Sequence, residues 1–169
     1  MTRFGLRLPN QQTRLIALAV SYHLSRPGAE LNPDTLAEYE HGLAGLLPVL
    51  DSQLDLETAV LEVTPLQAVL LSTAMSSVIG ELKMYSVFDT MSQGSRRPRS
   101  AATGFDDRLR TLFPEVVGDP ACATMLAESM TMLRREIPSG RAREIIGEER
   151  RASLAARARK KRWQFWKRA

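Results

Sequence analysis

Cationic and aromatic side chains are concentrated at the C-terminal end of the chain, and their chemistry suits binding to phosphate. Residues 150–169 contain nine Lys or Arg and no acidic residue, with two Trp and one Phe set among them. Guanidinium groups bind phosphate through paired hydrogen bonds, and aromatic rings stack on unpaired bases or lie at a lipid headgroup layer. The predicted site for a polyanion comprises Arg157, Arg159, Lys160, Lys161, Arg162, Trp163, Phe165, Trp166, Lys167 and Arg168.

Three interpretations of this segment are open: nucleic-acid binding, attachment to an anionic membrane surface, and protein docking or a solvated basic terminus. At 100° per residue a helix places Ile145, Ala152 and Trp163 on one stripe, whereas Phe165 falls on the opposite side. Cations surround such a helix, which weakens the membrane interpretation because an interfacial helix needs a clean apolar face. We therefore favour nucleic acid, bound without sequence specificity because the sequence has no helix-turn-helix or zinc-finger pattern.

The charge of the chain is divided between its two parts. Fourteen of the 23 Lys and Arg and all 19 Asp and Glu lie in residues 1–149, so that part has a net charge of −5. Residues 150–169 have a net charge of +9. A division of this kind indicates an anionic partner for the basic segment, or contact between that segment and the rest of the chain.

The histidines do not indicate catalysis, a cofactor or a metal ion. Neither His23 nor His41 has a metal-ligating partner three or four residues after it, and the chain has no phosphate loop, nucleophile elbow or dinucleotide fingerprint. An enzyme would need a pocket that brings one histidine beside an acid such as Glu81 or Asp89. We therefore expect a non-enzymatic binding or adaptor protein with no catalytic residue, cofactor or metal site.

Other chemically notable residues are expected to be structural. Asp106 and Asp107 are adjacent at the start of a predicted helix, where the helix dipole favours acids. Cys122 is the single cysteine, which excludes an intrachain disulfide, and its helical context predicts a small apolar packing residue. The methionines between residues 75 and 132 are interpreted as core residues or, alternatively, as an adaptable binding groove.

Two stretches of the sequence are each predicted to form a strand followed by a helix. Residues 3–8 alternate, with Phe4, Leu6 and Leu8 on one side, and Pro9 is expected to stop the strand before a helix with an apolar stripe at Leu15, Leu18, Ala19 and Tyr22. A related pattern lies 55 residues later, where Thr64, Pro65 and Gln67 form a capping box. This indicates a weak internal duplication whose two strands pair into a minimal sheet.

The remaining chain is predicted to be mainly helical. A helix starts at Asn32 and ends or kinks at Pro48, another runs from Pro65 to about Asp89, and further helices cover 105–113, 119–137 and a last stretch from 141. The predicted divisions are a helical body at 1–91, a flexible linker or long loop at 92–104, a helical extension of the body at 105–149 and the basic aromatic tail at 150–169.

The fold class predicted from the sequence is mainly α. We expect a small helical domain, with a two-stranded sheet if the duplicated strand–helix unit is real, plus a basic C-terminal helix or tail. Hydrophobic residues make up 44% of the chain, enough for a core. No apolar run approaches the ~20 residues that a membrane-spanning helix needs, and the single cysteine and lack of a signal sequence predict a cytoplasmic location.

Overall fold

The structure is a computed structural model that describes residues 2–25, 42–91, 104–119 and 121–166; at 86–91, 117–118 and 158–166 it describes the backbone only. It is a small, mainly α-helical domain with a two-stranded antiparallel sheet, as the sequence predicts. Its elements in chain order are β1 (Phe4–Pro9), α1 (Asn10–Ser25), the 3-10 helix η1 (Leu43–Leu46), α3 (Leu47–Asp51), β2 (Thr58–Val63), α4 (Pro65–Met91), α5 (Phe105–Leu112), α6 (Glu115–Gly118), α7 (Ala121–Glu136) and α8 (Ser139–Trp166).

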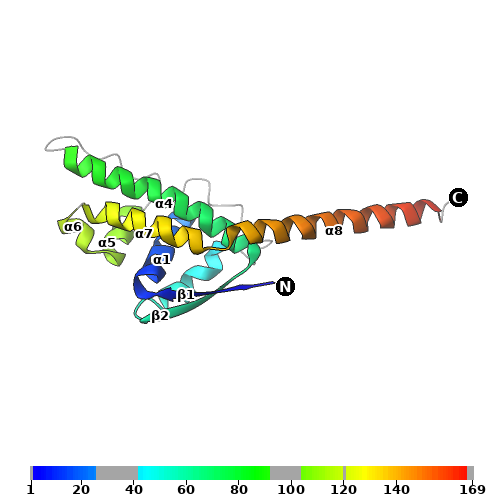
Figure 1. The fold of residues 1–169 in the computed structure, drawn as a ribbon, viewed down its shortest axis with the longest axis horizontal. Helices are drawn as coiled ribbons and strands as arrows, with labels where there is room; N and C mark the ends of the chain where they lie inside the picture. Colours follow the sequence, from blue (N-terminus) through cyan, green and yellow to red (C-terminus); the bar gives the residue numbers. More distant parts are fainter. Residues whose placement is uncertain (1, 26–41, 92–103, 120, 167–169) are drawn as a thin grey trace.

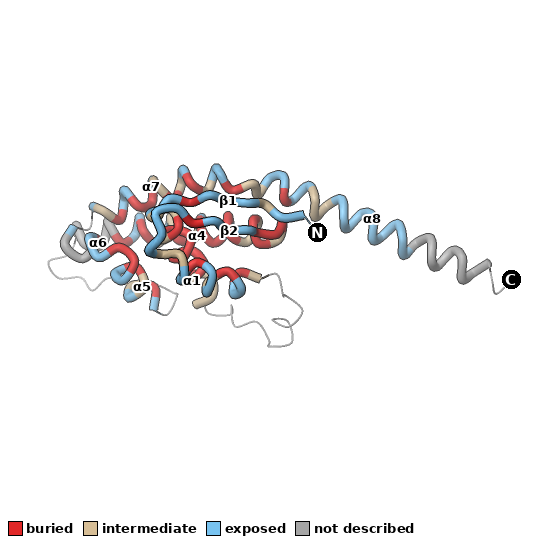
Figure 2. Tube along the Cα trace, turned by 90° about the horizontal axis from the view of Figure 1, so that it is seen from below, coloured by how far each residue is buried: buried red, intermediate tan, exposed pale blue. Residues whose placement is uncertain are grey.

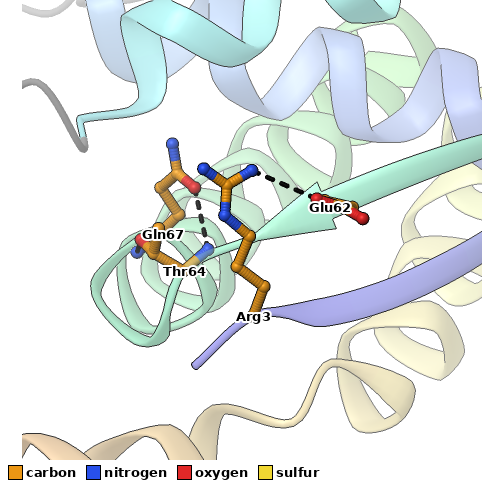
Figure 3. A network of polar contacts seen from close by, with 4 residues as sticks. All are labelled: Arg3, Glu62, Thr64 and Gln67. Atoms are coloured by element: carbon orange, nitrogen blue, oxygen red, sulfur yellow. Dashed lines mark hydrogen bonds and ion pairs between the residues drawn. The ribbon is translucent and has the colours of Figure 1, made fainter. Parts of the chain in front are cut away.

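The two strands pair in a register that keeps their apolar residues on one face. Leu6 lies opposite Leu61, Leu8 lies opposite Ala59 and Phe4 lies opposite Val63. Paired residues in an antiparallel sheet point to the same face, and successive residues alternate. The face formed by these pairs packs on the helices, while the other face is exposed, with Arg3 forming a 3.1 Å ion pair with Glu62 there (Figure 3).

The pairing agrees with the predicted duplication. A shift of 55 residues superposes Leu6 on Leu61, and this same pair is opposed in the sheet. A two-fold rotation about an axis through this pair, perpendicular to the sheet, exchanges β1 with β2 and keeps each face of the sheet on the same side. The helices that follow the two strands, α1 and α4, pack against each other. The duplication itself stays a hypothesis, because strand–turn–helix units are common.

Helix α1 is the centre of the core. The predicted stripe of Leu15, Leu18, Ala19 and Tyr22 is buried, but so are Ile16, Ala17 and Val20, which the stripe leaves on other sides of the helix. The sheet, α3, α4, α5 and α7 all contact α1. The predicted stripe is therefore confirmed, and burial extends beyond it because neighbours cover α1 nearly all round.

Polar contacts fix the ends of α1. The Asn10 side chain donates hydrogen bonds to the carbonyl oxygens of Leu54 and Leu56, which ties the start of α1 to the loop before β2. At the other end, the Tyr22 hydroxyl donates to the carboxylate of Glu81 on α4 at 3.0 Å. The Tyr22 ring meets Phe105 of α5 edge to face, with ring centroids 5.3 Å apart.

Helices α4 and α7 lie side by side over α1, and α8 continues away from this body (Figure 1). The predicted helix starting at Pro65 is confirmed, and it ends at Met91. The helices predicted at 105–113 and 119–137 are confirmed as α5 and α7. Buried residues line α1, α4 and α7, whereas residues 148–157 of α8 are exposed (Figure 2).

One prediction about a proline needs correction and another is confirmed. Pro48 was expected to end or kink a helix, but it lies in the first turn of α3, where its missing N–H costs nothing. Pro9 was expected to stop the first strand, and it is the last paired residue of β1, opposite Thr58. The predicted helix start at Asn32 lies outside the described residues, as does the predicted linker at 92–103. Gly104 adopts φ +77° at the start of α5, a left-handed conformation that favours glycine.

The capping box before α4 is confirmed. The backbone N–H of Thr64 donates to the Gln67 side-chain oxygen at 2.9 Å (Figure 3), and the backbone N–H of Gln67 donates to the Thr64 hydroxyl at 3.2 Å. The Gln67 amide nitrogen also donates to the carbonyl oxygen of Gly42 at 3.2 Å. Both capping residues are buried, so water cannot replace these hydrogen bonds.

Replacing Thr64 with Ala should lower the free energy of unfolding by about 1–2 kcal/mol, because the buried N–H of Gln67 loses its acceptor. Thr73→Ala is the matched control. Thr73 is exposed on the same helix and its hydroxyl bonds only to the carbonyl of Val69 one turn back, so its loss should change stability little. Denaturant titration of both variants measures the difference, and equal stabilities would contradict a role for the capping box.

Candidate functional site

The candidate site lies on α8, which has a packed root and a projecting arm. Ala142 is fully buried, and Ile145, Ile146 and Gly147 are half-buried in the part of α8 that contacts α4. We call residues 139–147 the root. From Glu148 to Arg157 every side chain is exposed, and Figure 1 shows the helix continuing away from the body. We call residues 148–166 the arm.

The local sequence explains why the helix continues beyond the body. The arm is composed largely of Ala, Arg, Lys and Glu, which have high helix propensity, and it contains no Gly or Pro. The root supplies the first turns through its packing on α4, which removes the unfavourable nucleation step of an isolated helix. The 28 residues of α8 span about 42 Å at 1.5 Å per residue.

The structure describes the predicted site residues to different extents. Arg157 is exposed on the arm. For Arg159, Lys160, Lys161, Arg162, Trp163, Phe165 and Trp166 the structure gives a helical backbone without side chains, and Lys167 and Arg168 lie outside the described residues. The backbone therefore supports the helical spacing used in the sequence analysis. Their grouping into one binding site stays a prediction.

Sequence reasoning left two exposed cations out of the site. Arg150 and Arg151 belong to the basic segment but were not assigned a binding role, and both are exposed at the start of the arm. The Arg151 Nε donates to the carbonyl oxygen of Gly147 at 3.2 Å. The abrupt change from Glu148 and Glu149 to an acid-free sequence is the signal that marks this boundary.

The described part of the chain includes several of the residues considered as alternative sites. His23 is half-buried at the end of α1, and the carboxylate of Glu81 on α4 accepts a hydrogen bond from the hydroxyl of Tyr22. Asp106 and Asp107 lie in the first turn of α5, as predicted. Among the described residues, which do not include His41, no group of three or more His, Cys, Asp or Glu side chains is placed to hold a metal ion.

Cys122 packs against the core, as its helical context predicts. The thiol is half-buried at the start of α7, and partial burial together with the carboxylates of Asp119 and Glu115 raises its pKa. A raised pKa keeps the thiol protonated near neutral pH, which is the opposite of an activated nucleophile.

The methionines divide between the two predicted roles. Met75 and Met130 are fully buried in the core. Met84, Met125 and Met132 are exposed on α4 and α7. Because seven residues separate Met125 from Met132, both lie on one side of α7, but nothing else in the described structure marks that side as a groove.

Comparison with known proteins gives no match from which a function could be assigned to the site. No known family model matches the sequence, and no curated protein or solved structure matches the chain. Among the described residues, no helix is long and apolar enough to cross a membrane.

Deleting residues 150–169 should leave the melting transition of the remaining chain nearly unchanged, because Arg150–Arg157 are exposed and bury no core residue. A chain that ends at Ile137 is the matched comparison. It loses Ala142 and the half-buried isoleucines that cover α4, so we expect a clear loss of stability. Thermal unfolding followed by circular dichroism measures both, and destabilisation by the shorter deletion would show that the arm packs on the body.

Proposed function

We propose that this chain is a non-enzymatic binding or adaptor protein whose C-terminal helix binds a polyanion, preferentially nucleic acid and without sequence specificity. The observation that carries the proposal is the projection of α8. Its arm holds nine Lys or Arg when the two terminal cations are included, has no acid after Glu149, and exposes every side chain from Glu148 to Arg157.

The charge distribution favours binding of a polyanion to the basic segment. Residues 1–149 have a net charge of −5, so the body repels a polyanion, whereas the basic segment attracts it. Each phosphate that the arm neutralises releases condensed counterions into solution, which drives binding at low salt. Binding of the polyanion is therefore directed to α8.

The aromatic residues favour nucleic acid with unpaired bases. Trp163, Phe165 and Trp166 are within one helical turn of each other and directly follow four consecutive cations, 159–162. Stacking of one base on an aromatic ring is worth about 1–3 kcal/mol, and only unpaired bases expose their faces. On a helical backbone Arg159 and Lys160 lie on the same side as Trp163, which interrupts the apolar face that a membrane-surface helix requires.

Replacing Arg159, Lys160, Lys161 and Arg162 with Gln should weaken binding of single-stranded RNA most strongly at low salt. Loss of four phosphate contacts reduces the slope of log K against log salt by about 0.7 for each contact. Gln at Arg110, an exposed arginine of α5, is the control for a charge change elsewhere and should leave the slope unchanged. A salt titration of the three proteins provides the measurement.

Replacing Trp163, Phe165 and Trp166 with Ala should weaken single-stranded RNA more than duplex DNA, because stacking requires unpaired bases. Leu154→Ala is the control, since Leu154 is an exposed apolar residue of the same arm with no aromatic ring. The same variants are titrated with anionic vesicles. Loss of vesicle binding with unchanged nucleic-acid affinity would identify a membrane-surface adaptor, and absence of binding to all three probes would overturn the proposal of a polyanion site.

A further inference from the structure

Three exposed arginines form a row along α8 that begins in the root. Arg143, Arg150 and Arg157 are separated by seven residues, which is 20° short of two complete helical turns. They therefore lie almost in line at intervals of about 10.5 Å, and all three side chains are exposed. The backbone position of Lys161, one turn further on, continues the row.

The row is free of compensating acids. Residues three or four positions away are the neighbours of a side chain on a helix surface. Around Arg143, Arg150 and Arg157 these positions hold Ser, Gly, Ile, Leu and Lys, and no Asp or Glu. Within the described part of the chain, none of the three guanidinium groups takes part in an ion pair or a side-chain hydrogen bond. Their charge is therefore available to a ligand.

Arg141 and Arg151 each have an acidic neighbour on the helix surface, unlike the three arginines of the row. Arg141 has Glu144 three residues after it, and Arg151 has Glu148 three residues before it. Arg141 is also two residues from Arg143, which places the two side chains about 160° apart around the helix. The chain thus offers an exposed arginine in the same root that lies off the row.

We infer that Arg143, Arg150 and Arg157 form a linear track for the backbone of an extended single-stranded nucleic acid, so that the binding site begins at Arg143 and not at the arm. This inference rests on the proposed function. Arginines at regular intervals along a helix bind phosphates spaced along one extended strand, whereas a compact anion would occupy a single arginine. The track leads toward the aromatic residues at the far end of the arm, where the bases of the same strand stack.

The test compares Arg143→Gln, Arg143→Lys and Arg141→Gln in the full chain, with a single-stranded polyuridylate of about twenty nucleotides as the probe. Arg143→Gln should reduce the slope of log K against log salt by about 0.7, the value for one phosphate contact with a single strand. Arg143→Lys keeps the charge and should keep the slope, and Arg141→Gln should match the unmodified chain. Matched melting transitions exclude a folding defect as the cause.

A second test varies the length of the polyuridylate probe. A polyuridylate of about four nucleotides is long enough to occupy one stacking site. It should bind at the aromatic end of the arm, far from Arg143. The unmodified chain and Arg143→Gln should therefore bind it with equal affinity. An unchanged slope in Arg143→Gln, or an equal loss in Arg141→Gln, would overturn the track while the arm variants still lose binding. No binding of either probe by the unmodified chain would overturn both the track and the proposed function.

Discussion

The nearly complete burial of α1 is the constraint on which the rest of the structure depends. Ile16, Ala17, Leu18, Ala19 and Val20 are consecutive and fully buried, so no side of this segment can face water without loss of hydrophobic free energy. The chain meets this demand with the sheet below α1 and with α3, α4, α5 and α7 around it. Helix α4 is itself covered further, since it also packs against α7 and α8.

The course of α8 follows from that arrangement. Once the sheet and the other helices surround α1, the last helix finds apolar surface only along α4, where Ala142 is buried. Beyond Gly147 no further apolar surface is available, and the helix continues because its residues favour helix and its first turns are already formed. A helix held in this way presents its side chains at fixed intervals, which is what the proposed arginine track requires.

The distribution of charge is also related to the packing of the core. The core holds apolar residues and a few buried polar ones such as Thr13 and Ser72, and no Asp or Glu whose burial is described is among the buried residues. From Arg150 to Arg157 every side chain is exposed. In the proposed function, this separation of charge along the chain directs a polyanion to α8.

The sequence by itself determined the mainly helical class, the two strands, the capping box at Thr64 and the bounds of α4, α5 and α7, because these depend on local periodicity and capping. The composition of the basic segment was equally plain, and its helical backbone agrees with the spacing analysis. Only the tertiary structure decided that α1 is covered on all sides, that Leu6 pairs with Leu61, and that Pro48 begins a helix. It also decided where α8 leaves the body, so that Ala142 is buried and Arg150 is exposed. The physical reason is that periodicity records which residues avoid water, whereas the partners that cover them lie far away in the sequence.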